Sequence, residues 1–321
     1  MLADKSRKGN KTINLAIEFN SHAACAHVAK HNGWFEEYGL QINTYDSYMT
    51  GMALASALAR GSIDAAYICL IPAINAYANA GIPIKVVAGT HKYGYGLAVN
   101  PDKIRTVKDL ENPKIRIGCT REGSPTDALL HKMIEKYNLD PTTVLTNVRR
   151  MNSTEQLLAL KIGQLDAGIM GEQYPTLAEE LGFTLLLTAQ DLWPDMQGSV
   201  LIVTDDLLKN HGDIVESLVR ITRLSTDWIA DHPDEAAAIV ASELTNIGER
   251  IFPTSVAKLS TELEISPSAV LKSLTMRMIC TTDIDSNEVQ NTIDYAASIG
   301  NIKQRVDAVE ILDLRWLAHD Q

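Results

Sequence analysis

The sequence predicts an α/β fold made of two lobes joined by a two-stranded hinge. Apolar segments typical of strands alternate with amphipathic segments typical of helices, and this alternation favours sheets flanked by helices. One unit of strands and helices occurs twice, because the segment 57–68 recurs as 159–170, an offset of 102 residues. The chain of 321 residues is also long enough for two domains of roughly 150 residues each.

The first copy of the repeated unit is predicted to run strand, helix, strand, helix, strand. Its elements lie at residues 13–17, 23–32, 40–45, 50–61 and 63–70. Gly33 and Gly61 are placed to end the two helices, since glycine is favoured where the backbone leaves a helix. Leu54, Ala57 and Leu58 recur at helical spacing and should face the core.

The second copy begins with a predicted strand over residues 114–119. The helix after it has Ser124 as its candidate N-cap, followed by a proline that suits the first helical position. In the next helix, Ser153 and Gln156 have the spacing of a capping box, and Gly163 ends that helix. Two such units with right-handed crossovers imply two lobes with parallel sheets.

Two extended, glycine-containing segments flank the second copy, at residues 94–99 and 198–203. We interpret them as crossovers between the lobes, so that the first lobe is discontinuous. The predicted division is residues 1–96 with 200–321 for the first lobe and 97–199 for the second. The tail of the chain is helical in pattern and is expected to pack back on the first lobe. Its predicted helices lie at 214–230, 233–243 and 267–278.

Charge and hydropathy argue against several kinds of partner. The chain has 29 Lys and Arg against 40 Asp and Glu, a net charge of −11, and no basic stripe, so we expect no nucleic-acid partner. The longest apolar stretch, residues 65–80, contains Pro72, Asn75 and Asn79 and falls short of the roughly 20 apolar residues of a membrane span. The polar start, residues 1–12, lacks the pattern of a secretory leader, so either the protein is cytoplasmic or a leader has been removed.

No sequence motif for catalysis, a metal or a cofactor is found. The four cysteines, at positions 25, 69, 119 and 280, are scattered and form no C-x-x-C pair. Three of them lie in or beside apolar runs, where we expect buried free thiols. The sequence has no G-x-S-x-G, H-E-x-x-H or P-loop pattern. We therefore predict no catalytic residue, no metal site and no cofactor.

Seven segments carry a resemblance that extends over nearly the whole chain. They lie at residues 21–42, 57–81, 106–118, 159–175, 191–194, 227–241 and 281–285. In order and spacing they resemble the SsuA/THI5-like, NMT1-type solute-binding proteins of ABC importers, which include receptors for sulfonates, taurine, nitrate and thiamin pyrimidine precursors. The resemblance implies a type II periplasmic-binding fold with a small-molecule solute in the cleft. It also implies an ABC permease as partner and a periplasmic or lipid-anchored extracytoplasmic location.

The cleft between such lobes is lined by loops that lead from strands into helix N-termini, where unpaired N–H groups attract polar ligands. We expect these loops at residues 18–22, 48–51, 69–70, 90–93, 120–124, 151–153 and 171–174, with Trp193 beside them. Within them the candidate ligand-binding residues are Glu18, Ser21, His22, Tyr48, Thr50, Cys69, Thr90, His91, Tyr93, Arg121, Gly123, Ser124, Ser153, Glu172, Tyr174 and Trp193.

Several candidates have both a functional and a structural interpretation. Ser21 with His22, and Gly123 with Ser124, start equivalent helices and could contact a ligand or only cap the helix. Arg121 could bind a carboxylate or sulfonate, or remain a solvated loop charge. The histidines could donate to an anion or be structural, and the aromatic candidates could enclose a planar ligand or pack in the core.

Three glutamates in or beside the predicted loops, Glu18, Glu122 and Glu172, bear on the choice of solute. Carboxylates repel a bare anion and suit a ligand that carries hydrogen-bond donors. We therefore expect a taurine-like solute or an amine-bearing heterocycle such as a thiamin pyrimidine precursor rather than nitrate. A simple alkanesulfonate fits only if these glutamates point away.

We predict a monomeric receptor that closes on its solute by bending at the hinge. The main alternative is a cytoplasmic enzyme on the same fold, similar to pyrimidine synthases or menaquinone-pathway enzymes. The missing leader fits that alternative, whereas the missing catalytic motifs do not. A second alternative is a ligand-sensing module similar to the effector domains of LysR-type regulators, but no helix-turn-helix precedes residue 13.

Overall fold

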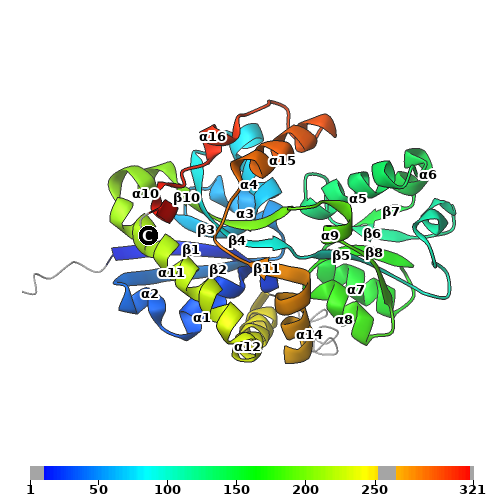
Figure 1. Cartoon of the computed structure of the whole chain (residues 1–321), viewed down its shortest axis with the longest axis horizontal. Helices are drawn as coiled ribbons and strands as arrows, with labels where there is room; N and C mark the ends of the chain where they lie inside the picture. Colours follow the sequence, from blue (N-terminus) through cyan, green and yellow to red (C-terminus); the bar gives the residue numbers. More distant parts are fainter. Residues whose placement is uncertain (1–10, 252–264, 319–321) are drawn as a thin grey trace, which may run out of the picture.

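The computed structural model describes residues 11–251 and 265–318, which form two α/β lobes (Figure 1). The two sheets confirm the predicted architecture. The strands of the first sheet lie in the order β11 (Met278–Cys280), β4 (Ile84–Tyr93), β10 (Gln197–Thr204), β3 (Ala65–Cys69), β1 (Lys11–Glu18) and β2 (Leu40–Tyr48). Those of the second lie in the order β7 (Val148–Arg150), β6 (Ile117–Cys119), β8 (Ala167–Gly171), β5 (Tyr95–Val99) and β9 (Thr184–Thr188).

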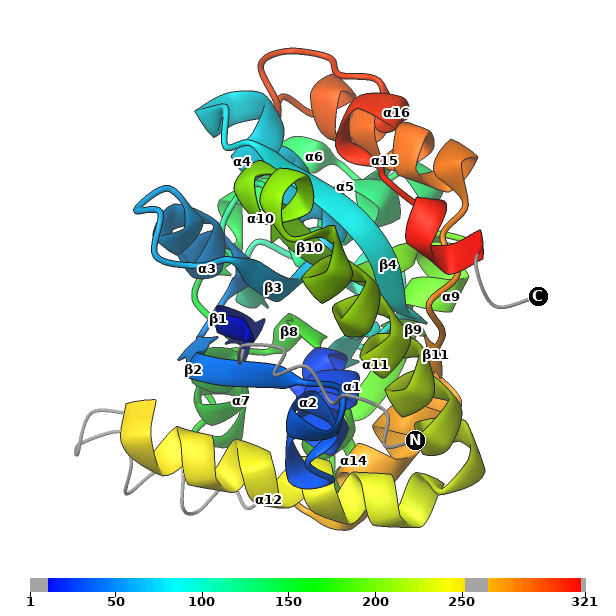
Figure 2. The same cartoon turned by 90° about the vertical axis from the view of Figure 1, so that its left-hand side faces the viewer.

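Helices cover both faces of each sheet (Figures 1 and 2). On the first sheet, one face packs against α1 (Ala24–His31), α11 (Gly212–Asp231) and α12 (Pro233–Ile251). The other face packs against α3 (Gly51–Leu58), α4 (Leu70–Ala80) and α15 (Ser286–Ser298). On the second sheet, α5 (Pro125–Lys136) packs on one face, and α7 (Ser153–Lys161) with α8 (Tyr174–Glu180) on the other.

Shorter elements connect these layers. They are η1 (Ser21–Ala23), α2 (Trp34–Glu37), η2 (Val107–Glu111), α6 (Pro141–Thr146), α9 (Ala189–Leu192), α10 (Asp205–Asn210), α14 (Pro267–Lys272), η3 (Ser273–Arg277), α16 (Ala308–Ile311) and η4 (Arg315–Ala318). Within the described part of the chain, no helix has the length and apolar character needed to span a membrane.

The predicted repeat appears as the same strand arrangement in both lobes. Strand β1 pairs in parallel with β2 and β3, and β6 pairs in parallel with β7 and β8. The same contact recurs at the start of each unit. The Asp64 carboxylate accepts a hydrogen bond from the Asn14 N–H at 2.7 Å, and the Asp166 carboxylate accepts one from the Arg116 N–H at 2.9 Å. Such charge-assisted bonds are strong, so both copies fix their first strand in the same way.

The predicted capping box of α7 is wrong by one residue. It joins Asn152 and Glu155 rather than Ser153 and Gln156. Asn152 lies 102 residues after Thr50, the N-cap of α3, so the repeat itself identifies the correct cap. Ser153 instead begins the helix, and its hydroxyl accepts a hydrogen bond from a backbone N–H at the end of β8.

The chain crosses between the lobes at two adjacent segments. It enters the second lobe through Gly94 and returns through residues 193–196. The crossings are bonded to each other, since the Tyr93 N–H donates to the Met196 carbonyl at 3.0 Å. Most of the predicted crossover segments belong to β5 and β10. These two strands run antiparallel to β8 and β3, so the expectation of parallel sheets holds only within the repeated unit.

The helical tail packs on the first lobe through α11 and α12 and then reaches the second lobe. Lys272 in α14 pairs with Glu179 in α8 at 2.9 Å, and the Ser273 hydroxyl donates to the Glu172 carboxylate at 2.7 Å. The helix predicted over 267–278 ends instead at Lys272, where a π-helical turn leads into the edge strand β11. The tail therefore connects the two lobes beside the crossings.

Gly94 is the point where the two lobes and the first crossing meet. Its carbonyl oxygen accepts a hydrogen bond from His22 Nε2–H of the first lobe at 2.7 Å and one from the Glu172 N–H of the second at 2.9 Å. Its φ is +86°, and a Cβ at this position would lie 2.8 Å from His22 Nε2. Only glycine satisfies both requirements without strain.

Replacing Gly94 by alanine should destabilise the protein more than the same change at another glycine of similar φ. Gly182 has φ +89° and nothing within 4 Å of an added Cβ, so Gly182→Ala measures backbone strain alone, about 1–2 kcal/mol. We expect urea unfolding to show a clearly larger loss for Gly94→Ala. Equal losses in the two variants would contradict the close approach of His22 to Gly94.

Candidate functional site

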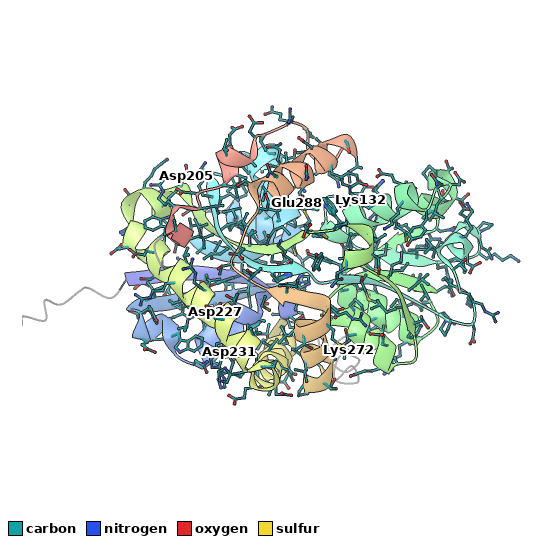
Figure 3. The ribbon with its side chains drawn as sticks, viewed as in Figure 1. Lys132, Asp205, Asp227, Asp231, Lys272 and Glu288 are labelled. Atoms are coloured by element: carbon teal, nitrogen blue, oxygen red, sulfur yellow. The ribbon has the colours of Figure 1, made fainter. Side chains whose placement is uncertain are left out.

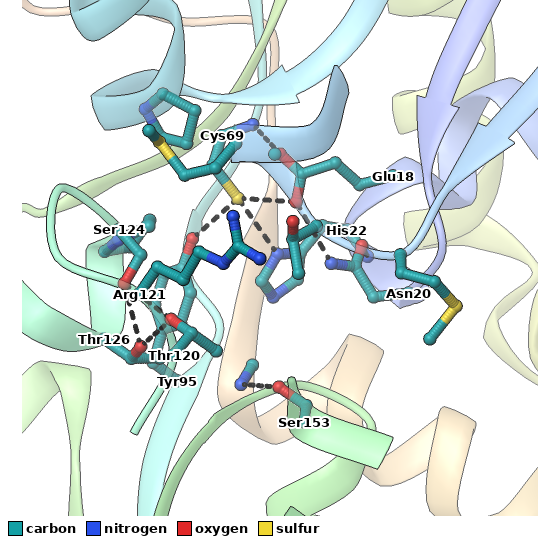
Figure 4. A pocket seen from close by; sticks show the side chains of 17 residues that line it. Glu18, Asn20, His22, Cys69, Tyr95, Thr120, Arg121, Ser124, Thr126 and Ser153 are labelled. Atoms are coloured by element: carbon teal, nitrogen blue, oxygen red, sulfur yellow. Dashed lines mark hydrogen bonds between the residues drawn. The ribbon is translucent and has the colours of Figure 1, made fainter. Parts of the chain in front are cut away.

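A cavity of about 60 Å³ lies between the lobes (Figure 4) and adjoins a wider groove of about 340 Å³. From the first lobe its lining comprises Glu18, Asn20, His22, Met49, Thr50, Gly51, Met52, Cys69 and Pro72. From the second lobe it comprises Tyr95, Thr120, Arg121, Ser124, Pro125, Thr126, Ser153 and Gly171. Five of these residues also line the groove, so the two spaces are parts of one cleft: Met49, Thr50, Met52, Thr120 and Arg121.

The cleft lies where strands end and helices begin. Glu18 is the last residue of β1, Cys69 is the last of β3, and Gly171 is the last of β8. Thr50 caps α3 and Ser124 caps α5. Carboxyl ends of strands and N-termini of helices therefore meet at the cleft, which is the usual position of a ligand in open α/β sheets.

Glu18, His22 and Cys69 form a cluster on the floor of the cavity, and each residue is only 3% exposed. The Cys69 Sγ lies 3.1 Å from Glu18 Oε2 and 3.7 Å from His22 Nδ1. The hydroxyls of Tyr95 and Ser199 donate to the same sulfur at 3.1 and 3.4 Å. The sequence predicted each of the three clustered residues and suggested Glu18 with His22 as a possible acid–base pair, but it gave no sign that Cys69 joins them.

Burial disfavours the charged form of each group in this cluster. It raises the pKa of the Glu18 carboxyl, against the lowering effect of hydrogen bonds from Cys69 and Asn20. It raises the pKa of the Cys69 thiol well above its usual value, and it lowers the pKa of His22 to about 4. A charge in this floor would need a bound partner of opposite sign.

The opposite wall presents hydroxyl groups and a cation. The hydroxyls of Thr120, Ser124 and Thr126 hydrogen-bond to one another at the start of α5. Arg121 extends from the same loop toward the cavity (Figure 4), and no described carboxylate forms an ion pair with it. A guanidinium without an intramolecular partner can bind a carboxylate or sulfonate through two parallel hydrogen bonds.

The structure divides the predicted ligand-binding residues into two groups. Those that line the cavity are Glu18, His22, Thr50, Cys69, Arg121, Ser124 and Ser153. Those outside the lining are Ser21, Tyr48, Thr90, His91, Tyr93, Gly123, Glu172, Tyr174 and Trp193. Direct contact of the first group with a solute stays a prediction.

Five of the predicted ligand-binding residues belong to the first lobe but lie outside the lining. The N–H of Ser21 donates across the lobes to Gln173 Oε1 at 3.0 Å, and the cap of its helical turn is Asn20. The ring of His91 lies behind His22, with centroids 4.4 Å apart. Strands β2 and β4 hold the other three, Tyr48, Thr90 and Tyr93.

Glu172 is buried away from the cavity and joins the tail to the second lobe. Its carboxylate accepts hydrogen bonds from the hydroxyls of Ser273 and Thr176. Glu122 is exposed and lies 3.9 Å from Arg150. Of the three glutamates expected to repel an anion, only Glu18 lines the cavity, so the acidic character of the site is smaller than the sequence predicts.

The aromatic candidates of the second lobe take part in packing. The Tyr174 hydroxyl accepts a hydrogen bond from Thr154 at 2.7 Å. Trp193 meets Tyr295 edge to face at 5.3 Å between centroids, and the ammonium group of Lys132 lies over both rings. Figure 3 marks Lys132 where α5 faces α15.

In the second lobe, Gly123 is also outside the lining. Its carbonyl accepts a hydrogen bond from the Asn75 amide at 2.9 Å.

Sequence reasoning did not single out several lining residues. Asn20, Met49, Gly51, Thr120 and Gly171 lie within the predicted loops but were not among the predicted ligand-binding residues. The other five belong to helices and strands, outside the loops that the sequence predicts to line the cleft. They are Met52, Pro72, Tyr95, Pro125 and Thr126.

The two-sheet fold and the cavity between its lobes define a protein of the periplasmic-binding-protein fold class. The chain belongs to the NMT1-like family, whose model matches residues 6–245. The family match confirms the resemblance found in the sequence. A search of curated proteins gives no significant match.

Solved structures share the fold at low sequence identity. The ligand-binding component of an ABC-type import system from Staphylococcus aureus, with zinc bound, has a TM-score of 0.77 and 18% identity over 97% of this chain and 99% of that chain. The alkanesulfonate-binding protein SsuA from Xanthomonas axonopodis pv. citri, bound to MOPS, has a TM-score of 0.76 and 17% identity over 96% of this chain and 100% of that chain. The periplasmic nitrate-binding protein NrtA from Synechocystis PCC 6803 has a TM-score of 0.74 and 14% identity over 95% of this chain and 86% of that chain.

The neutral, buried state of His22 should make the fold sensitive to acid. Its pKa is about 4 in the folded protein and about 6.5 in an unfolded chain. Between these values the unfolded state binds a proton that the folded state does not, so stability falls as the pH is lowered. At pH 4.5 the free energy of unfolding should be lower than at pH 7 by roughly 2–3 kcal/mol because of His22 alone.

Urea unfolding at pH 7 and pH 4.5, in metal-free buffer, checks this expectation. His22→Gln should lose less stability on acidification than the wild type, because it lacks the titrating ring. His211→Gln is the matched control, since His211 is exposed, and it should follow the wild type. An equal loss on acidification in His22→Gln and wild type would show that His22 does not set this pH dependence.

Proposed function

We propose that the protein is the monomeric solute-binding component of an ABC importer, acting outside the cytoplasm in the periplasm or on a lipid anchor. The observation that carries the proposal is a cavity lined by side chains of both lobes, beside two hydrogen-bonded crossings. A ligand that contacts both lobes stabilises the closed form relative to the open one. The closed face would then be recognised by the permease.

We propose that the lobes move as units about the two crossings. The division predicted from the sequence, residues 1–96 with 200–321 and residues 97–199, lies within a few residues of the bends, which we place at Gly94 and at residues 193–196. Opening the cleft would break some of the contacts between the lobes. Two of them are the hydrogen bonds from Ser21 to Gln173 and from Asn75 to Gly123.

We propose a small solute with an anionic group at one end and an amine at the other. Arg121, the hydroxyls of the α5 wall and the N-termini of α3 and α5 suit a sulfonate or carboxylate. Glu18 on the floor suits a hydrogen-bond donor, because an approaching ammonium group favours its charged form. Taurine-like amino-sulfonates fit both ends, and amine-bearing heterocycles such as thiamin pyrimidine precursors fit the floor alone. MOPS, bound by the Xanthomonas protein, also combines a sulfonate with an amine.

The chemistry of Cys69 favours binding over catalysis. A nucleophilic cysteine needs a pKa lowered by nearby cations, whereas burial and Glu18 raise the pKa of this thiol. His22, the adjacent base, donates its Nε2 proton to a backbone carbonyl and is held neutral. We therefore propose that the site binds its solute without transforming it.

A thermal-shift screen of sulfonates, amino-sulfonates, amino acids and aminopyrimidines tests this function, since a bound ligand raises the melting temperature by mass action. For the best solute, Arg121→Gln should weaken the affinity about tenfold or more by calorimetry, because a charge-assisted contact is lost. Arg149→Gln is the matched control, as Arg149 is exposed on β7 outside the cleft. Wild-type affinity in Arg121→Gln would mean that the anionic end binds elsewhere.

A further inference from the structure

The floor of the cleft brings together three side chains of the types that bind transition metals. A carboxylate oxygen of Glu18, a ring nitrogen of His22 and the sulfur of Cys69 all lie within 4.8 Å of one another. Within the described residues no other buried group of this kind is found. We propose that these three residues form a zinc-binding site, an inference that does not depend on which solute the cleft accepts.

The spacing of the three ligand atoms suits a tetrahedral zinc ion. Bonds of roughly 2.3 Å to sulfur and 2.0 Å to nitrogen or oxygen separate tetrahedral ligand atoms by about 3.3–3.6 Å. The observed separations from Cys69 Sγ are 3.7 Å to His22 Nδ1 and 3.1 Å to Glu18 Oε2. Small side-chain adjustments would therefore complete three corners of a tetrahedron.

Neighbouring groups already hold each ligand in a metal-binding orientation. The Nε2–H of His22 donates to the Gly94 carbonyl at 2.7 Å, which leaves Nδ1 with a free lone pair. The Cys69 N–H donates to Glu18 Oε1 at 2.7 Å, which leaves Oε2 to face the sulfur. Hydrogen bonds of this kind, donated by ligand histidines and accepted by ligand carboxylates, orient metal sites generally.

Two of the groups around the sulfur favour a thiolate. Tyr95 and Ser199 each aim a hydroxyl donor at Cys69 Sγ. A thiolate and a carboxylate together carry two negative charges, which a zinc ion would neutralise, so the occupied floor would be buried without net charge. Burial raises the pKa of both groups when no cation is present, so zinc binding should release protons.

Three protein ligands leave a fourth corner, and the cavity is the space beside it. Sites with an open position accept water or a donor atom of a ligand. An amine could occupy it through its nitrogen lone pair, in place of the ammonium contact with Glu18 proposed above. Zinc and solute would then bind cooperatively, although either could also bind alone.

Metal content of the purified full chain tests the proposal. The protein is stripped with chelator under a thiol reductant, incubated with zinc sulfate, exchanged into metal-free buffer and analysed by mass spectrometry of elements. We expect one zinc per chain, and an affinity about tenfold or more lower in Cys69→Ser, His22→Gln and Glu18→Gln. Cys119→Ser is the matched control, because Cys119 is also buried at the end of a strand near the cleft but belongs to no ligand cluster.

Cobalt provides an independent readout of the sulfur ligand. Co²⁺ added to the stripped protein should give thiolate-to-metal charge-transfer absorption that Cys119→Ser keeps and Cys69→Ser loses. Circular dichroism of the stripped variants establishes that each is folded. Zinc bound equally by wild type and folded Cys69→Ser, or no zinc bound by the wild type, would overturn the site. Solute binding that persists in chelator would leave the proposed transport function standing without it.

Discussion

The carbonyl oxygen of Gly94 accepts one hydrogen bond from each lobe, and these two bonds fix how the lobes meet at the cleft. One donor is His22 on the floor of the cleft, and the other is the backbone of Glu172 at the end of β8. Because Gly94 is also the first crossing between the lobes, the orientation of His22 and the approach of the lobes are set at one point. A change in the angle between the lobes would therefore change the geometry of the floor, and a ligand held there would resist that change.

The cleft combines two electrostatic environments at a short distance. The floor is buried, and desolvation disfavours the charged forms of its acid, thiol and imidazole. The rim carries an exposed guanidinium and the N-termini of helices, which favour negative charge. A solute with opposite polarity at its two ends satisfies both, whereas a bare anion satisfies only the rim. This difference, rather than the number of acidic residues, favours a solute that carries donors as well as an anionic group.

The fold was predictable from the sequence because its signals are local and occur twice. The strands, the glycines that end the helices and the cap at Ser124 are all set by neighbouring residues, and the offset of 102 relates the two lobes. The site was predictable only in part. Strand ends located Glu18 and Cys69, but their contact with His22 depends on packing between distant segments. Glu172 and Trp193 were expected in the cleft because loop position alone does not show which way a side chain points, and both turn toward the C-terminal tail.

The central claim is that a solute holds the two lobes together, and a distance measured across the cleft tests it most directly. Spin labels at Ser56→Cys on α3 and Gln164→Cys in the second lobe, both exposed positions, would span the groove in a Cys280→Ser background. Pulsed dipolar spectroscopy should show a broad distance distribution without solute and a shorter, narrower one at saturating solute. An unchanged distribution at saturation would contradict the clamp.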